Sequence, residues 1–179
     1  MTDAKLQREL LQQAFAIGVP RDYGKLRKLR PVREPAVLLG IGLDTQGREQ
    51  CLVPRAARAW QRMCDAAAEN GITLQLVSAF RSIEYQLGIF KRKLERGLSI
   101  AEILEANAAP GYSEHHSGRA LDITTQGFAA LEEEFENSAA FAWLQANAQT
   151  YGFRLSFPRG NPHGITYEPW HWCWRRCRK

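Results

Sequence analysis

The chain of 179 residues is 45% hydrophobic and 24% charged, and its formal net charge is +5 at pH 7. These values are ordinary for a globular domain with a single sizeable core, which excludes fibrous and low-complexity classes. No window approaches the roughly 20 consecutive apolar residues that cross a bilayer, so we expect no membrane span.

The N-terminal stretch MTDAKLQRELLQQAFAIG predicts an amphipathic helix, because Leu6, Leu10 and Phe15 fall near one face. Charges interrupt each of its apolar runs and no small-residue cleavage site follows, so it does not have the pattern of a signal peptide. We therefore expect a cytoplasmic protein, or a periplasmic or cell-envelope protein if a leader is missing from this chain. Residues 19–35, rich in Pro and Arg, predict an irregular connection.

Basic residues cluster in that connection and at the C-terminus: Arg21, Lys25, Arg27, Lys28, Arg30 and Arg33, then Arg175, Arg176, Arg178 and Lys179. A solvated basic surface is the favoured interpretation, and attraction to a polyanion is the alternative. Nucleic acid is not an expected partner, because the chain has no RNP-type motif, zinc-finger spacing or basic heptad region.

Four cysteines, Cys51, Cys64, Cys173 and Cys177, could pair in three ways. The CWRRC spacing is neither that of a CxxC redox motif nor that of a zinc ribbon. Free thiols are favoured over a disulfide, because no export signal is visible.

The middle of the chain alternates strand and helix patterns. Residues 36–43 and 48–53 predict two strands around the turn DTQG, and a helix follows over 54–68 with Pro54 in its first turn. The alternating, β-branched stretch 72–78 predicts a strand, and 82–96 predicts a second helix. Ser99 and Glu102 make a capping box for a third helix.

The C-terminal half predicts a loop over 110–118, a strand over 119–124 and a helix over 138–152 that ends at Gly152. FRLSF, GITYE and WHWCW then predict short final strands. The fold class is therefore α+β, with a small, mostly antiparallel central sheet and flanking helices. Chemistry would sit on the loops and strand ends that this sheet holds in place.

The first candidate site lies in SEHHSGRALDIT, residues 113–124, where His115 or His116 could bind a metal ion together with Asp122. Hydrolytic zinc takes three protein ligands and leaves a fourth position open, with a carboxylate nearby to take a proton. An ionised Asp122 between Leu and Ile needs a partner if it points inward. The alternative is a strand-end hydrogen-bond acceptor beside exposed loop histidines.

The second candidate site is TYEPWHWCW, residues 166–174, with Glu168 and His171 on either side of Pro169. The proline argues against the helix of an HExxH metallopeptidase. In an extended segment the two side chains would face opposite ways, unless a bend at Pro169 brings them together. Spacing alone leaves the pair ambiguous between a site and an exposed Glu beside a core His.

Taken together, the motifs resemble the zinc D-alanyl-D-alanine carboxypeptidases of the VanY type. That family shares its fold with the D-Ala-D-Ala dipeptidases, the phage L-alanyl-D-glutamate endopeptidases and the hedgehog signalling domain. The resemblance covers about residues 54–174 and includes EPWH, SAFRS with Gln86 downstream, and FAWLQANAQTYGFRLSFPRG. Its most specific motif is SxHxxGxAxD, present as Ser113, His115, Gly118, Ala120 and Asp122.

The resemblance implies a metal site made of His115, Asp122 and His171, with one Zn²⁺ per chain and Glu168 as general base. His116 falls on a variable position, and neighbouring residues of an extended segment face opposite ways, so His115 is the predicted ligand. His163, in GNPHG, matches no ligand position.

The resemblance also implies that Arg81 stabilises the oxyanion and holds the carboxyl end of the substrate, as suits a planar, always-charged donor. Ser113, Gln86 and Trp170 are candidate substrate-binding residues, although Ser113 could equally cap the loop and Trp170 belong to the core. The family tyrosine in SGYRS is Phe80 here, so any role of that hydroxyl is absent.

The sequence thus predicts a single peptidase domain over 1–179, with a core at 54–174 and an extension at 1–53 that packs on it. The predicted function is a zinc D-alanyl-D-alanine carboxypeptidase acting as a monomer on peptidoglycan peptides. The alternatives are an L-alanyl-D-glutamate endopeptidase, a D-Ala-D-Ala dipeptidase or a non-catalytic zinc-binding protein. Glu168 argues against the last, because a purely structural zinc site needs no general base.

Overall fold

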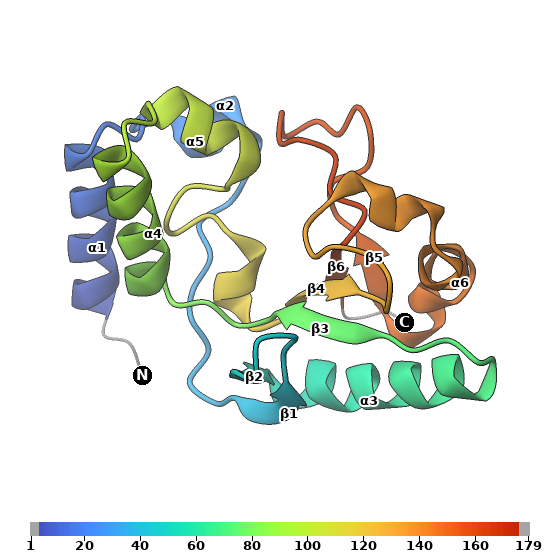
Figure 1. The fold of residues 1–179 in the computed structure, drawn as a ribbon. Coiled ribbons are helices and arrows are strands. Elements are labelled where there is room, and N and C mark those ends of the chain that lie inside the picture. The colour runs from blue at the N-terminus through green and yellow to red at the C-terminus, as the bar shows by residue number, and fades with distance from the viewer. Residues whose placement is uncertain (1–3, 176–179) are drawn as a thin grey trace.

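The computed structural model, which describes residues 4–175, has four strands joined in one antiparallel sheet at its centre (Figure 1). These strands are β3 (Gln75–Ser78), β4 (Ala120–Thr124), β5 (Phe153–Leu155) and β6 (His171–Trp174), in the order β3-β4-β6-β5. All five residues of β4 are buried, because it lies inside the sheet between β3 and β6. The small antiparallel sheet with its flanking helices confirms the α+β prediction.

The predicted hairpin is formed by β1 (Leu39–Leu43) and β2 (Glu49–Leu52) around the DTQG turn. The buried carboxylate of Asp44 holds this turn. It accepts hydrogen bonds from the backbone N–H groups of Gln46 (2.8 Å) and Arg48 (3.0 Å), and pairs with the Arg48 guanidinium (2.7 Å).

The hairpin contacts helix α3 (Pro54–Glu69), which lies under the central sheet in Figure 1. Proline begins α3 without losing a hydrogen bond, since the first N–H groups of a helix have no partner within it. Helix α6 (Ala139–Asn147) continues as a 3-10 turn, η3 (Ala148–Tyr151). These elements and the sheet share one hydrophobic core, whose largest members include Trp60, Met63, Phe141 and Trp172.

A second core joins the helices on the left of Figure 1: α1 (Ala4–Ala16), α2 (Tyr23–Leu26), α4 (Ile83–Glu95) and α5 (Ile100–Ala106). Leu10 of α1 is buried there and Phe15 packs against the same cluster, whereas Leu6 is 43% exposed. Ser82 caps α4, and the predicted capping box of Ser99 with Glu102 begins α5.

Some predicted elements were wrong. GITYE is not a strand. The N–H of Thr166 donates to the carbonyl of Glu105 and that of Glu168 to the carbonyl of Phe157, so the segment bonds to two separate parts of the chain and not to one neighbouring strand. The loop at 110–118 contains the 3-10 turn η1 (Glu114–Ser117), and a second such turn, η2 (Glu133–Asn137), follows β4. The irregular connection over 19–35 includes the short α2.

Cys51, Cys64 and Cys173 are free thiols, whereas Cys177 and the basic residues Arg176, Arg178 and Lys179 lie outside the described residues. Within residues 4–175, none of the helices has the length and apolar character that a membrane crossing requires.

Candidate metal centre and active site

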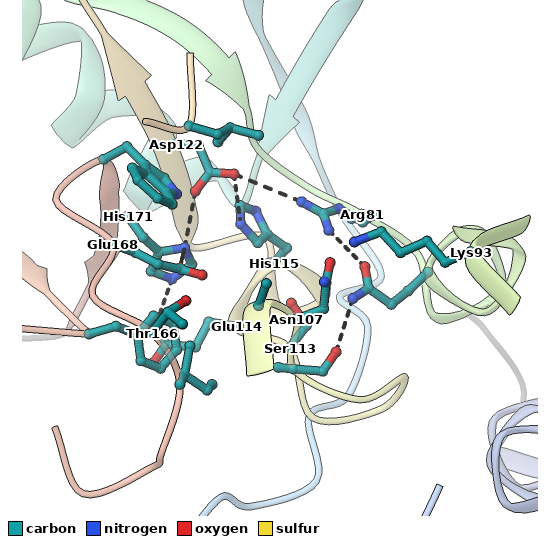
Figure 2. Close-up of a pocket in the computed structure, with 17 residues that line it drawn as sticks. Arg81, Lys93, Asn107, Ser113, Glu114, His115, Asp122, Thr166, Glu168 and His171 are labelled. Carbon is teal, nitrogen blue, oxygen red and sulfur yellow. Dashed lines mark hydrogen bonds and ion pairs between the residues drawn. The ribbon is translucent and has the colours of Figure 1, made fainter. Parts of the chain in front are cut away.

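The register between β4 and β6 brings two predicted metal ligands together. Asp122 and His171 are direct partners across this antiparallel pair, so their side chains share one face of the sheet. The third, His115, comes from η1, which immediately precedes β4. Figure 2 shows the three side chains converging on one point.

A β-turn brings Glu168 to the same point. The N–H of His171 donates to the carbonyl of Glu168 at 3.1 Å, which closes a turn with Pro169 in its second position. The Glu168 carboxylate therefore lies 3.7 Å from Nδ1 of His171. The bend at Pro169 that the sequence left open is present.

The geometry of the three side chains fits zinc. His115 Nε2 lies 3.2 Å from one Asp122 oxygen, and His171 Nδ1 lies 3.1 Å from the other. Ligand atoms around a tetrahedral zinc ion at about 2.0–2.1 Å are about 3.3 Å apart. Two imidazoles and one carboxylate, all buried, are also a donor set that zinc prefers.

The remaining nitrogen of each histidine is bound to an acceptor. His115 Nδ1 lies 2.5 Å from the carbonyl of Ala79, and His171 Nε2 lies 3.1 Å from Oε2 of Glu114. A carbonyl can only accept, so Nδ1 of His115 carries the hydrogen and its Nε2 lone pair faces the site. Such outer partners fix the tautomer and ring orientation of metal-binding histidines.

His116 does not belong to the cluster. Its ring is fully buried away from the three ligands' contacts: Nε2 accepts from the N–H of Gly111 at 3.1 Å, and Nδ1 lies 2.6 Å from the carbonyl of Arg81. Burial lowers the pKa of His116 to about 4, so the ring is neutral. His163, as expected of a loop residue, lies in a turn and contacts the carbonyl of Arg27.

Charges in the cluster are strongly coupled. Burial alone would raise the pKa of Asp122, but His115 and His171 hold it well below its ordinary value. Burial lowers the pKa of His115. For His171 burial acts in the same direction, but hydrogen bonds with Asp122 and Glu114 outweigh it and raise its pKa to about 10.

The pKa of Glu168 is shifted in the opposite direction to that of Asp122. Burial raises its pKa to about 7, because no hydrogen bond or close cation offsets the loss of solvent as completely as for Asp122. A carboxylate whose pKa lies near neutrality can both take and return a proton, which is what a general acid–base residue requires.

Arg81 lines the wall of the site opposite Glu168 and His171. Its guanidinium lies 3.8 Å from Asp122 and donates to Oε1 of Gln86 at 2.8 Å. Gln86 is buried and donates to the carbonyl of Ala108 at 3.0 Å, so it ties Arg81 to the loop after α5. Gln86 therefore orients the arginine, in addition to lining the cavity.

A cavity of about 300 Å³ connects these groups, and Ser113 and Trp170 line it as well. Ser113 is buried and has no side-chain cap on η1. Trp170 is half-buried and packs against the first core while it lines the cavity, so its role toward a substrate stays a prediction.

Lys93, which the sequence analysis missed, lines the same cavity and extends toward Arg81 in Figure 2. Burial and the charge of Arg81 lower its pKa, and no carboxylate within residues 4–175 pairs with it. Lys93 follows Gln86 by two helical turns of α4, so the two share a helix face. That spacing could have identified Lys93 from the sequence.

Glu114 was also missed. It is mostly buried, and its two oxygens contact His171, Ser156 and Arg175. Burial would raise its pKa, but the hydrogen bond with His171 and nearby charges lower it to about 2. The sequence carried no signal for this contact, since His171 lies far away in the chain.

A family model described as VanY, D-alanyl-D-alanine carboxypeptidase, matches residues 49–176. YodJ of Bacillus subtilis, which is named as a carboxypeptidase, is 43% identical over 122 residues, 65% of this chain. The bifunctional D-Ala-D-Ala dipeptidase and carboxypeptidase VanXYC of Enterococcus gallinarum is 32% identical over 67% of this chain. The chain spans 43% of the length of YodJ and 65% of VanXYC.

Three solved structures are similar. The LD-carboxypeptidase LdcB has a TM-score of 0.70 at 35% identity, over 79% of this chain and 69% of that one. VanYB, solved with D-alanine-D-alanine, has a TM-score of 0.62 at 26% identity, over 81% of each chain. A VanY variant solved with Zn(II) has a TM-score of 0.61 at 25% identity, over 82% of each chain.

Proposed function

Because the chain belongs to the VanY D-alanyl-D-alanine carboxypeptidase family, we propose that it removes the terminal D-alanine from peptidoglycan stem peptides that end in D-Ala-D-Ala. The observation that carries the proposal is the cavity in which Glu168 faces the triad of His115, Asp122 and His171. When bound to that triad, zinc would act as a Lewis acid toward the scissile carbonyl and the attacking water.

The distribution of charge along the cavity orients the substrate. The carboxylates of Asp122, Glu114 and Glu168 lie at the end of the cavity that holds His115 and His171, whereas Arg81 and Lys93 form its cationic end. The C-terminal carboxylate of a peptide pairs with these cations, and its last peptide bond then lies toward Glu168. A substrate that continues past this bond would leave the two cations without a carboxylate, which favours a carboxypeptidase over an endopeptidase.

Glu168 carries the proton through the reaction. It takes a proton from the water as the oxygen attacks the carbonyl carbon, and the guanidinium of Arg81 stabilises the negative charge that develops on the carbonyl oxygen. Glu168 then delivers the proton to the amide nitrogen as the C–N bond breaks. The products are a shortened peptide with a new carboxylate and a free amino acid.

The test is product analysis by mass spectrometry with a pentapeptide ending in D-Ala-D-Ala, in the presence of zinc. We expect loss of one D-alanine, and a decrease of at least about 1,000-fold in kcat for Glu168→Gln, which retains the shape but cannot take the proton. Glu133→Gln, an exposed residue outside the cavity, is the control. Cleavage between L-Ala and D-Glu would instead identify an endopeptidase.

The similarity to LdcB supports a second candidate, removal of D-alanine from a tetrapeptide in which an L-centre precedes the scissile bond. The same residues perform the same chemistry, and only the stereocentre before the bond differs. The ratio of kcat/KM for matched penta- and tetrapeptides decides between the two activities. A ratio above one supports the D,D-carboxypeptidase, and a ratio below one supports the L,D-carboxypeptidase.

A further inference from the structure

The ring of His171 is held between two carboxylates on opposite sides. Nδ1 lies 3.1 Å from Asp122 and faces the triad, whereas Nε2 lies 3.1 Å from Oε2 of Glu114. An imidazole offers a lone pair to a metal ion through only one nitrogen when the other carries a hydrogen. The partner on Nε2 therefore decides which nitrogen faces the metal.

Glu114 is itself fixed in place. The hydroxyl of Ser156 donates to Oε2 at 2.5 Å, and the Arg175 guanidinium pairs with Oε1. The side chain of Glu114 is 15% exposed, so water competes little for these contacts. Its backbone belongs to η1 and immediately precedes His115, so one short turn carries a candidate ligand and the partner of another.

We propose that Glu114 is a positioning residue that accepts the Nε2 hydrogen of His171 and thereby directs Nδ1 toward the metal ion. The inference rests on the metal site of the proposed function. Glu114 is not one of the three grouped ligands, because its Oε2 meets Nε2 of His171 whereas Asp122 meets Nδ1, the other nitrogen of the ring. A carboxylate behind a histidine ligand fixes the tautomer and increases the basicity of the ring.

The experiment measures zinc affinity by competition with a chromophoric chelator, which needs no substrate. Glu114→Gln keeps the size of the side chain but removes its charge, and we expect the dissociation constant for zinc to increase about 10- to 100-fold. The absorption spectrum of the Co²⁺-substituted protein should change as well, because it reports the geometry of the ligands. A dissociation constant within twofold of wild type with an unchanged Co²⁺ spectrum would overturn the proposal.

A second pair of variants keeps the test decisive if Glu114→Gln does not fold. Arg175→Met removes an exposed contact of Glu114, and we expect a weaker increase of severalfold in the zinc dissociation constant. Arg119→Met is the matched control, because Arg119 is also exposed but stacks on Trp174 instead. Equal zinc affinity in these two variants would contradict the role of Glu114.

The two proposals fail separately. Zinc binding that depends on Glu114 in a protein that cleaves neither peptide would overturn the function and leave the positioning role intact. Wild-type protein that binds no zinc would overturn both.

Discussion

His115 and His116 are neighbours in sequence but differ completely in surroundings. His115 faces Asp122 across 3.2 Å, whereas His116 is bound to two backbone groups inside the loop. The family resemblance predicts His115 as the ligand, and the alternation of side chains along an extended segment predicts that only one of the two histidines faces the metal. In the structure the segment is a 3-10 turn and not a strand. The sequence could not show what His116 does, because its partners Arg81 and Gly111 come from two separate segments.

The second cation of the cavity, Lys93, gives a prediction at this scale. For Lys93→Met we expect KM for the pentapeptide to increase about tenfold or more with little change in kcat, since a hydrogen bond to a charged group contributes about 1.5–3 kcal/mol. Lys91→Met is the matched control, because Lys91 lies on the same helix but contacts Gln13 outside the cavity. Steady-state kinetics measure both. An unchanged KM in Lys93→Met would remove the lysine from substrate recognition.

At the scale of elements, local patterns predicted most helices well. The capping box of α5 and the proline at the start of α3 are both present, since these signals act within a single helical turn. GITYE failed because alternating side chains do not by themselves supply a neighbouring strand, and its N–H groups bond elsewhere. The sequence predicted the turn at Pro169 only as an alternative to an extended segment, because the closure of the turn depends on the position of β6.

The β1–β2 hairpin gives a pH prediction. Burial would raise the pKa of Asp44, but hydrogen bonds from Arg48 and Gln46 outweigh it and lower the pKa from 3.8 to about 2. Since the folded pKa lies below the unfolded value, the stabilisation is complete above about pH 4 and disappears as the pH falls toward 2. Asp44→Asn should therefore lower the free energy of unfolding at pH 7 by about 1–3 kcal/mol.

Urea unfolding at pH 7 and at several values between 4 and 2 measures this effect. The difference between wild type and Asp44→Asn should shrink as the pH falls. Asp65→Asn, exposed on α3, should change the stability at pH 7 by less than about 0.5 kcal/mol. A difference for Asp44→Asn that does not depend on pH would contradict the assignment.

At the scale of the whole molecule, the candidate site lies between two hydrophobic cores. Two of the three candidate ligands, Asp122 and His171, lie on the sheet of the first core, whereas Gln86 and Lys93 belong to α4, which packs against α1 in the second core. The family match begins at residue 49, so helix α1 supports the substrate side from outside the matched region. We propose this as the role of the extension at 1–53, which the sequence alone did not reveal.

Leu10→Ala tests that role. Leu10 is buried between α1 and its neighbours, so we expect the free energy of unfolding to fall by about 2–5 kcal/mol. Leu6→Ala, one turn earlier on the same helix but 43% exposed, should change it by less than about 0.5 kcal/mol. Urea titrations of both variants give the comparison. Equal losses would mean that α1 does not pack as described.

The pairing of Asp122 with His171 also sets when the protein can become active. Because side chains alternate along a strand, a slip of one residue between β4 and β6 would turn His171 to the other face of the sheet. His115 and Asp122 are close neighbours in the chain, whereas His171 follows Asp122 by 49 residues, so the three side chains meet only when β6 has paired with β4. Any zinc binding by this triad must therefore wait until the two strands have paired in the correct register.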